Sequence, residues 1–512
     1  MDPRFLFFKG QIKMKHSNII SLAAFFILIL SGEAFAQEMI QGDPFRDFPE
    51  LIKEFMSKWQ IPGMAIGVVR DDKVIYMQGF GYRDLKNKLP VTTKTVFGIG
   101  SISKSFTSMS VALLVDERKL RWDTPVIEFL PDFKLYDDYA TMHTTPRDLL
   151  CHRTGMADHL LMTYGSPFSR EEIYSRLRYL EPNLGFRERY QYNNLMYVIA
   201  GYLVGRVSGG TWEDFVTRRI LKPLEMEDTN FSQEIINVED YSLPYLFNDR
   251  EILALPFRKK YSSAPAGGIN SNIEDMIKWL KLYLDQGKTG EKQLVSDKSL
   301  KEILTPQMPV NFAPESAVGP VTDYGLGWNI QPYLGHHLNH VGGWIEGYVS
   351  WISFMPFDNI GVAVLCNMSD CVLPYFLNYL IYSRLLGLEK IDWQKIIDSY
   401  EPNYLSPSYS VRRKPRSNPD RPSLPPEELE GTYNHPGYGR IVITQENGNL
   451  FALFNGEKMK LNHFRDNIFL TEHLLFGFNG KRINFIANDQ GKIERLEMAL
   501  QEGVKDIVFL RQ

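Results

Sequence analysis

The apolar residues that open the globular part of the chain recur at the spacing of a helix. They stand at i, i+3, i+4, i+7, i+8 and i+11, which is typical of an amphipathic helix with one buried face; they are Phe48, Leu51, Ile52, Phe55, Met56 and Trp59. Pro62-Gly63 ends this helix. Two strand-like runs, 64–69 and 74–78, then flank a polar turn and predict a hairpin. A helix followed by an antiparallel hairpin favours a mixed α/β layer over a βαβ fold.

The middle of the chain changes from helical to strand patterns. Helical spacing dominates from about Thr95 to Leu221. Tyr324–Trp328 is expected to form a strand whose glycines allow close backbone approach. The runs 348–355 and 360–365 predict consecutive antiparallel strands, and 372–388 predicts a long amphipathic helix that returns to cover the sheet.

The last part of the chain has a different composition. Residues 401–428 are rich in Pro, Ser and Arg and predict an exposed linker. Residues 429–512 contain short strand-like runs, and Asn-Gly pairs, which favour tight turns, punctuate them. This pattern predicts a small antiparallel barrel or sandwich as a separate domain.

The N-terminus has the three parts of a secretory signal peptide. Basic residues precede an apolar run, 19–30, which ends in the small-residue site Ala34-Phe35-Ala36. We therefore expect residues 1–36 to be a signal peptide, with Met1 or Met14 as the start, and the protein to be exported to the periplasm or secreted. The run is short for a membrane span, so membrane association is expected only if the signal stays uncleaved.

Composition narrows the classes of partner. The 512 residues carry a net charge of -4 without a long run of either sign in the globular part, which gives no reason to expect a nucleic-acid partner. Three cysteines are too few for a disulfide framework; Cys366 and Cys371 could pair across a short loop, although buried or free thiols are favoured. His336, His337 and His340 lie close together, but no His-Glu-x-x-His or Cys-x-x-Cys accompanies them. We expect no metal and no cofactor.

Candidate chemistry begins at Ser101 and Lys104. They stand three residues apart at the start of a predicted helix, so they lie on one face and can touch. Glycines before Ser101 let the chain turn sharply, and a serine at a helix N-terminus lies where a developing negative charge is stabilised. A partly desolvated lysine within reach could act as a base. Ser-x-x-Lys also occurs by chance, so its significance depends on partner motifs.

Three further stretches are candidates for such partners. In Tyr192-Asn193-Asn194 the phenol of Tyr192 and the carboxamide of Asn194 point the same way if the segment is extended; taken alone, the stretch is better explained as a tyrosine and an N-cap asparagine ahead of a helix. His152 has the titration range of a general base, but its place beside a Thr-Gly turn favours a hydrogen-bonded structural histidine. His340-Val341-Gly342 is the third stretch.

Taken in order, Ser101–Lys104, Tyr192–Asn194 and His340–Gly342 resemble the motifs of the serine β-lactamase and penicillin-binding-protein superfamily. The resemblance is to its class C-like members, which include D-alanyl-D-alanine carboxypeptidases, D-aminopeptidases and esterases. It implies an α+β fold, a β-lactamase-like α/β sandwich with an antiparallel sheet and a helical subdomain, over a domain of residues 37–400. Residues 429–512 resemble the lipocalin-like barrel that some of these hydrolases carry.

The resemblance also implies roles for individual residues. Ser101 would be the acylated nucleophile, Lys104 its proton partner and Tyr192 the base that activates Ser101 or the deacylating water. The remaining matches would bind substrate. Asn194 would bind the substrate amide, and His340 and Gly342 stand where the family has Lys-Thr-Gly. The backbone N–H of Gly343 would form the oxyanion hole together with that of Ser101. The implied reaction is two-step acyl transfer.

A neutral histidine at position 340 offers no permanent cation for a substrate carboxylate. We therefore rank the expected activities as D-amino-acid peptidase or carboxypeptidase first, esterase second and β-lactamase third. The substrate would be a small molecule or peptide, with cell-wall peptides as one source. Two alternatives stay open: a binding or sensing module that acylates without turnover, and a functional role for the barrel in ligand binding or oligomer formation.

Overall fold

The computed structural model describes residues 43–163, 165–248, 251–257, 262–310, 322–388, 391–400, 424–473 and 476–512. The expected signal peptide and residues 401–423 of the expected linker lie outside this part. Within it, no helix has both the length and the apolar character that crossing a bilayer requires. All three cysteines are buried free thiols.

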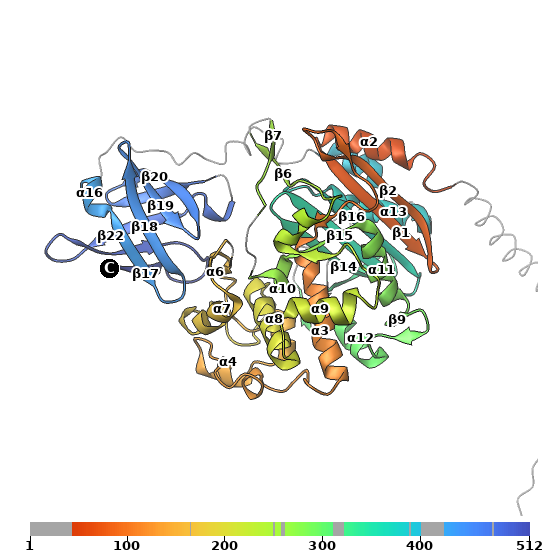
Figure 1. The fold of residues 1–512 in the computed structure, drawn as a ribbon, viewed down its shortest axis with the longest axis horizontal. Helices are drawn as coiled ribbons and strands as arrows, with labels where there is room; N and C mark the ends of the chain where they lie inside the picture. The colour runs from red at the N-terminus through yellow and green to blue at the C-terminus, as the bar shows by residue number, and fades with distance from the viewer. Residues whose placement is uncertain are drawn as a thin grey trace, which may run out of the picture.

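The core of the larger domain is a nine-stranded antiparallel sheet (Figure 1). Its order is β11 (Met308–Pro309), β12 (Asp323–Tyr324), β13 (Asn329–Tyr333), β14 (His336–Ile345), β15 (Tyr348–Met355), β16 (Ile360–Cys366), β1 (Gly63–Arg70), β2 (Lys73–Asp84) and β3 (Leu89–Pro90). The predicted hairpin is β1–β2. Because β1 also pairs with β16, the two ends of this domain's sequence meet in the middle of the sheet.

Side chains alternate between two buried faces along the central strands. On β1, Ile66 points into one apolar cluster, shared with α2 (Phe48–Lys58), α13 (Leu373–Leu386) and α14 (Trp393–Ser399). Ala65, the next residue back, belongs to a second cluster, which includes α3 (Ser103–Asp116) and α11 (Ile273–Leu284). The sheet is thus covered by helices on both sides, which confirms the expected sandwich.

The helical subdomain packs against α3, of which every residue from Ser103 to Leu114 is buried. Its other helices are α4 (Asp138–His143), α5 (Pro146–Leu150), α6 (Leu160–Thr163), α7 (Arg170–Arg176), α8 (Asn194–Ser208) and α9 (Trp212–Val216), with 3-10 turns η1 (Gly100–Ile102), η2 (Val126–Glu128), η3 (Leu177–Tyr179) and η5 (Ser232–Asn237) and the π-turn η4 (Thr217–Leu221). Two short helices, α10 (Ala264–Gly267) and α12 (Asp297–Leu304), follow later in the chain. Minor strands complete the domain: β4 (Phe97–Gly98), β5 (Asn230–Phe231), β6 (Tyr245–Asn248), β7 (Glu251–Ala254), β8 (Ile269–Ser271), β9 (Lys288–Thr289) and β10 (Lys292–Gln293).

The C-terminal domain is a closed eight-stranded barrel, preceded by α16 (Pro426–Leu429). Its strands are β17 (Gly431–His435), β18 (Gly439–Glu446), β19 (Asn449–Phe454), β20 (Glu457–Arg465), β21 (Ile468–Glu472), β22 (Arg482–Ala487), β23 (Ile493–Met498) and β24 (Ile507–Arg511), with the turn η7 (Phe476–Phe478). Asn447-Gly448 and Asn455-Gly456 have positive φ at both residues, as type I′ hairpin turns require. In Figure 1 the barrel lies beside α6 and α7 of the helical subdomain.

One predicted element is wrong. Tyr324–Trp328 was expected to be a strand, but β12 ends at Tyr324 and the next residues form a turn. The N–H of Gly325 donates to the carbonyl of Trp328 (2.9 Å), and Gly327 has φ +85°. The alternating glycines therefore form a turn that lies against α3, because a Cβ at Gly327 would lie 2.9 Å from Oγ of Ser108.

Candidate active site

Ser101 lies in the 3-10 turn η1, between strand β4 and helix α3. The turn depends on Gly100, which has φ +52° and whose missing Cβ would lie 2.8 Å from the backbone nitrogen of Trp344. Because η1 runs directly into α3, Ser101 and Lys104 lie on one face, as the spacing predicts. Nζ of Lys104 donates to Oγ of Ser101 at 3.0 Å.

Lys104 is fully buried and surrounded by acceptors. Besides Ser101, its Nζ contacts Oδ1 of Asn194 (2.7 Å) and the backbone carbonyl of Ala266 (2.7 Å). It also lies over the ring of Tyr192, 4.8 Å from the centroid. Burial lowers the pKa of Lys104 to about 7, which the negative charge of Asp158 partly opposes. A substantial fraction of this lysine is therefore neutral near pH 7 and can accept a proton.

Tyr192 approaches Ser101 from the helical subdomain. Its hydroxyl donates to Oγ of Ser101 at 2.7 Å, and its side chain is 38% exposed, so it borders the open side of the site. The following residue, Asn193, is the N-cap of α8: its Oδ1 accepts from the N–H of Met196, and its Nδ2 donates to the carbonyl of Met156. These hydrogen bonds of the N-cap hold the backbone next to Tyr192 in place and so fix the position of its side chain.

His152 supports this loop from behind. The N–H of Asn193 donates to its Nδ1 (3.0 Å), so Nδ1 is the acceptor and Nε2 carries the proton toward the hydroxyl of Tyr324 (3.2 Å). Burial, together with the charge of Lys104, lowers the pKa of His152 well below its ordinary value. This buried, neutral, hydrogen-bonded ring fits the structural histidine that the sequence favoured.

The structure adds a residue that sequence reasoning missed. The Asp158 carboxylate accepts from the N–H of Asn194 (2.7 Å) and from its Nδ2 (3.2 Å). Both ends of the Asn194 carboxamide are therefore engaged inside the protein, by Lys104 and by Asp158. Its expected contact with a substrate amide stays a prediction, for which a carboxamide has a further N–H and a further lone pair. No spacing pattern in the sequence pointed to Asp158, because it lies far from Ser101 and Lys104 in the chain.

Gly343 on β14 lies against the turn η1, which carries Ser101. A Cβ at this position would lie 1.9 Å from the carbonyl oxygen of Ile99 and 3.1 Å from the backbone nitrogen of Ser101. Only glycine lets the strand approach η1 this closely. The backbones of Ser101 and Gly343 are thus adjacent, as an oxyanion hole shared between them requires.

The structure does not bring His340 to Ser101. His340 is buried, its ring stacks on Trp351 with centroids 5.2 Å apart, and neither ring nitrogen has a hydrogen-bond partner among the described residues. Burial lowers the pKa of His340 to about 3. Gly342 makes room for this aromatic layer, because a Cβ there would lie 2.5 Å from the rings of both Trp344 and Trp351. Roles for His340 and Gly342 in substrate binding stay predictions.

The three histidines of β14 do not converge. His336 bonds to Asp358 (2.9 Å) and His337 lies near Phe357, whereas His340 stacks on Trp351. In the part of the chain that the structure describes, no three His, Cys, Asp or Glu side chains cluster as metal ligands would.

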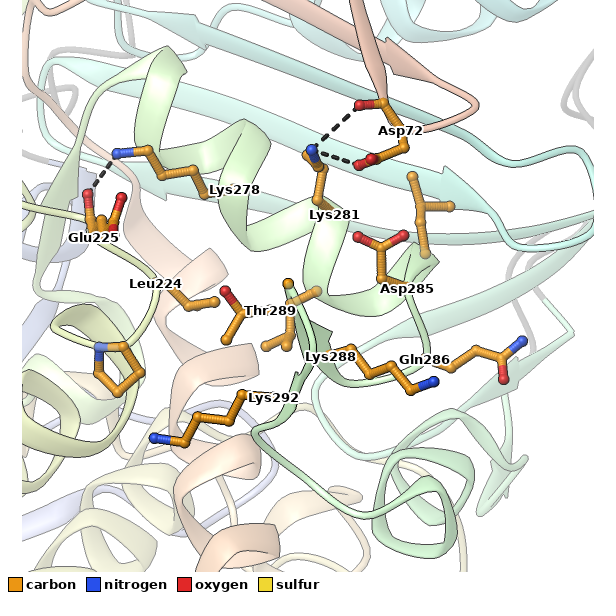
Figure 2. Close-up of a pocket in the computed structure, with 14 residues that line it drawn as sticks. Asp72, Leu224, Glu225, Lys278, Lys281, Asp285, Gln286, Lys288, Thr289 and Lys292 are labelled. Carbon is orange, nitrogen blue, oxygen red and sulfur yellow. Dashed lines mark hydrogen bonds and ion pairs between the residues drawn. The ribbon is translucent and has the colours of Figure 1, made fainter.

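A groove of about 970 Å³ lies elsewhere, between α11 and the β9–β10 hairpin (Figure 2). Its lining includes four lysines but none of the residues around Ser101. Two of these lysines are already paired, because Lys278 donates to the carbonyl of Glu225 and Lys281 contacts Asp72. We assign no catalytic role to this groove.

Comparison with known proteins agrees with this geometry. Residues 48–370 match the family model described as Beta-lactamase. The chain belongs to the beta-lactamase family. Residues 415–511 match a second model, described only as a domain of unknown function, DUF3471. These matches, with the fold, confirm a serine hydrolase of the β-lactamase and penicillin-binding-protein superfamily.

Proteins similar to this hydrolase include, by name, a hydrolase, a penicillin-binding protein homologue and an amidase. The unguisins hydrolase ungD' of Aspergillus campestris is 30% identical over 435 residues, 78% of either chain. The octameric penicillin-binding protein homologue from Pyrococcus abyssi superposes with a TM-score of 0.58 at 25% identity, over 90% of this chain and all of that one. D-amino acid amidase from Ochrobactrum anthropi shares the fold, with a TM-score of 0.55 at 20% identity over 67% of this chain and all of the other.

The close approach at Gly343 gives a direct test of the oxyanion hole. We expect Gly343→Ala to lower the rate of Ser101 acylation by about 10²-fold or more, because the added methyl group forces β14 away from the N–H of Ser101. The readout is the rate at which a fluorescent fluorophosphonate phosphonylates Ser101 and releases fluoride, because the phosphonyl oxygen uses the same N–H donors as the oxyanion. Gly210→Ala is the matched control, since nothing lies closer than 3.5 Å to its missing Cβ. Equal labelling of the two variants would contradict the assignment.

Proposed function

We propose that this hydrolase cleaves amide or peptide bonds of D-amino-acid compounds through an acyl-enzyme on Ser101. The observation that carries the proposal is the convergence of two proton-transfer groups on one oxygen. Oγ of Ser101 lies 3.0 Å from Nζ of Lys104 and 2.7 Å from the hydroxyl of Tyr192. One group can take the proton of the nucleophile while the other lies on the open side, where the leaving group departs.

The first step is acylation. Neutral Lys104 accepts the Ser101 hydroxyl proton as Oγ attacks the carbonyl carbon of the substrate. The carbonyl oxygen becomes an oxyanion, which the backbone N–H groups of Ser101 and Gly343 stabilise; one such donor is worth about 2.7–4 kcal/mol in a protease. Lys104 is then an ammonium ion, held by the Asn194 and Ala266 oxygens.

Collapse of this intermediate breaks the carbon–nitrogen bond and releases the amine. The amine nitrogen takes the proton of the Tyr192 hydroxyl, and Tyr192 recovers one from Lys104, since both groups contact Oγ of Ser101. Ser101 is left as an acyl ester and Lys104 is neutral again. A water molecule then attacks the ester and loses its proton to the same pair, and Oγ leaves as the restored hydroxyl.

Two observations favour amide substrates without a free carboxylate over substrates that carry one. The buried His340 ring, with its pKa lowered to about 3, supplies no cation for a substrate carboxylate. Trp344, next to Gly343, is 48% exposed and offers an apolar surface beside the oxyanion donors. The name of one structural neighbour, D-amino acid amidase, supports the same class of substrate, and the name of the relative unguisins hydrolase supports hydrolysis. We therefore place amidase or peptidase activity before carboxypeptidase and β-lactamase activity.

A substrate panel tests the proposal. We expect D-phenylalanine amide to be hydrolysed faster than its L enantiomer and faster than nitrocefin, a chromogenic β-lactam. Ser101→Ala is expected to lower kcat by about 10⁴-fold or more, because no other group replaces the nucleophile. Turnover of the β-lactam or of simple esters with both amides left intact would contradict the proposed substrate class. Unchanged hydrolysis in Ser101→Ala would contradict the mechanism.

We also propose that the protein is exported, which rests on the basic start, apolar run and Ala34-Phe35-Ala36 site of the sequence. Intact mass of the protein recovered from the cell envelope or medium is expected to give a chain that begins at Gln37. Ala34→Arg, which alters the cleavage site, is expected to retain the leader. Wild-type protein found in the cytosol with residues 1–36 intact would contradict export. We further propose that the protein forms an oligomer, since the Pyrococcus homologue is described as octameric; its mass in solution tests this.

A further inference from the structure

The barrel touches the hydrolase domain at the segment that leads into α6 (Figure 1). His159 belongs to this contact and is fully buried although it lies between two domains. Its N–H donates to Oε1 of Gln501 in the barrel (2.6 Å), and its Nδ1 lies 2.8 Å from the hydroxyl of Tyr438, also in the barrel. Two residues on, the carbonyl of Leu161 accepts from Nδ2 of Asn455, in the β19–β20 turn.

Which group donates in the hydrogen bond between Tyr438 and His159 follows from the contact that the other nitrogen of the His159 ring makes. Nε2 of His159 lies 2.8 Å from the carbonyl of Glu181, which can only accept, so Nε2 carries the proton. Burial lowers the pKa of His159 to about 4, so the ring is neutral and Nδ1 is an acceptor. Tyr438 must therefore donate its hydroxyl proton to Nδ1.

The backbone at His159 needs this support. It has φ +44°, in the left-handed region that non-glycine residues rarely adopt, and such a conformation persists only where surrounding contacts hold it. Three hydrogen bonds do so here, and two of them come from the barrel.

The residue before His159 is Asp158, whose carboxylate holds both the N–H and Nδ2 of Asn194. Oδ1 of Asn194 in turn accepts from Nζ of Lys104, the proton partner of Ser101. A continuous set of hydrogen bonds therefore runs from Tyr438 and Gln501 to His159 and, through one peptide bond, from Asp158 to Asn194 and Lys104.

We propose that the barrel is a positioning element of the active site: Tyr438 and Gln501 fix His159, and thereby hold Asp158 where it orients Asn194 and Lys104. This inference rests on the proposed roles of Ser101 and Lys104. Asp158 and Tyr438 are positioning residues, since neither touches Ser101. The domain of unknown function thus serves the hydrolase chemistry without contributing a reacting group.

The test uses the full-length protein and three single variants. Asp158→Asn removes the carboxylate charge. Tyr438→Phe removes only the hydroxyl that His159 accepts. Tyr433→Phe is the matched control, because Tyr433 is an equally buried barrel tyrosine whose hydroxyl bonds within the C-terminal domain, to the carbonyl of Leu429 in α16 (2.9 Å). The readout is the rate of Ser101 labelling by a fluorescent fluorophosphonate across pH, which needs no knowledge of the substrate.

We expect Asp158→Asn to slow labelling at its pH plateau by about tenfold or more, and Tyr438→Phe by about fivefold, while Tyr433→Phe stays at the wild-type rate. The charged or titratable side chains that face Lys104 in the described residues are those of Asp158, His152, Tyr192 and Tyr197. Of these, Asp158 favours the protonated lysine. The midpoint of the pH–rate curve should therefore move to lower pH in Asp158→Asn and, by a smaller amount, in Tyr438→Phe.

The double variant decides whether the two residues act through one route. If they do, Asp158→Asn combined with Tyr438→Phe is no slower than Asp158→Asn alone. Multiplicative losses, or a Tyr438→Phe rate and pH midpoint equal to those of Tyr433→Phe, would overturn the proposal. A loss of thermal stability in Tyr438→Phe with an unchanged labelling rate per folded molecule would also overturn it. Wild-type protein that labels at Ser101 but hydrolyses no amide would count against the proposed function alone.

Discussion

Burying an ammonium group without compensation is costly, and Lys104 has no exposed surface. The molecule meets this constraint with three oxygen atoms from separate parts of the chain: Oγ of Ser101, Oδ1 of Asn194 and the carbonyl of Ala266. These atoms come from η1, α8 and α10, so the geometry of one amine ties together three elements. The same burial lowers the pKa of Lys104 to about 7, as the proposed role of this lysine as a base requires.

The surrounding structure holds Lys104 and the residues around it in fixed positions. The sheet brings Gly343 of β14 against η1, at a distance that no larger residue permits. The Asn193 cap and the neutral His152 ring fix the loop of Tyr192, and Asp158 fixes the far end of Asn194. Such positioning matters because displacing a catalytic group by about 1 Å can cost about 10² in rate.

Much of this arrangement could be predicted from the sequence because it depends on local periodicity. Ser101 and Lys104 meet through helical spacing alone, and β15 has the bounds that its apolar run indicated. Asn-Gly pairs correctly marked barrel turns, since both residues need positive φ there. The contact of Tyr192 with Ser101 is different: it joins distant segments, and only the order of motifs in a known superfamily pointed to it.

The rest depended on packing between distant segments, which no local pattern encodes. The contact of Asp158 with Asn194 and that of Ala266 with Lys104 both arise only when the chain folds. Tyr324–Trp328 was misassigned because glycines that permit close approach in a strand serve equally in a turn. For His340 the motif gave a position on β14 but not its buried stacking on Trp351. The domain boundaries expected at residues 36, 400 and 428 also stay predictions.

The central claim is that a neutral Lys104 activates Ser101, and the most direct measurement is the titration of Lys104 itself. Lysine side chains labelled with ¹³C at Cε can be followed by NMR between pH 5 and 11, and Lys104→Arg identifies the resonance by its loss. The account predicts one lysine that titrates near pH 7, well below the ordinary value of about 10.4. A Lys104 resonance that titrates above pH 10 would contradict it, because the lysine would then be charged whenever Ser101 has to lose its proton.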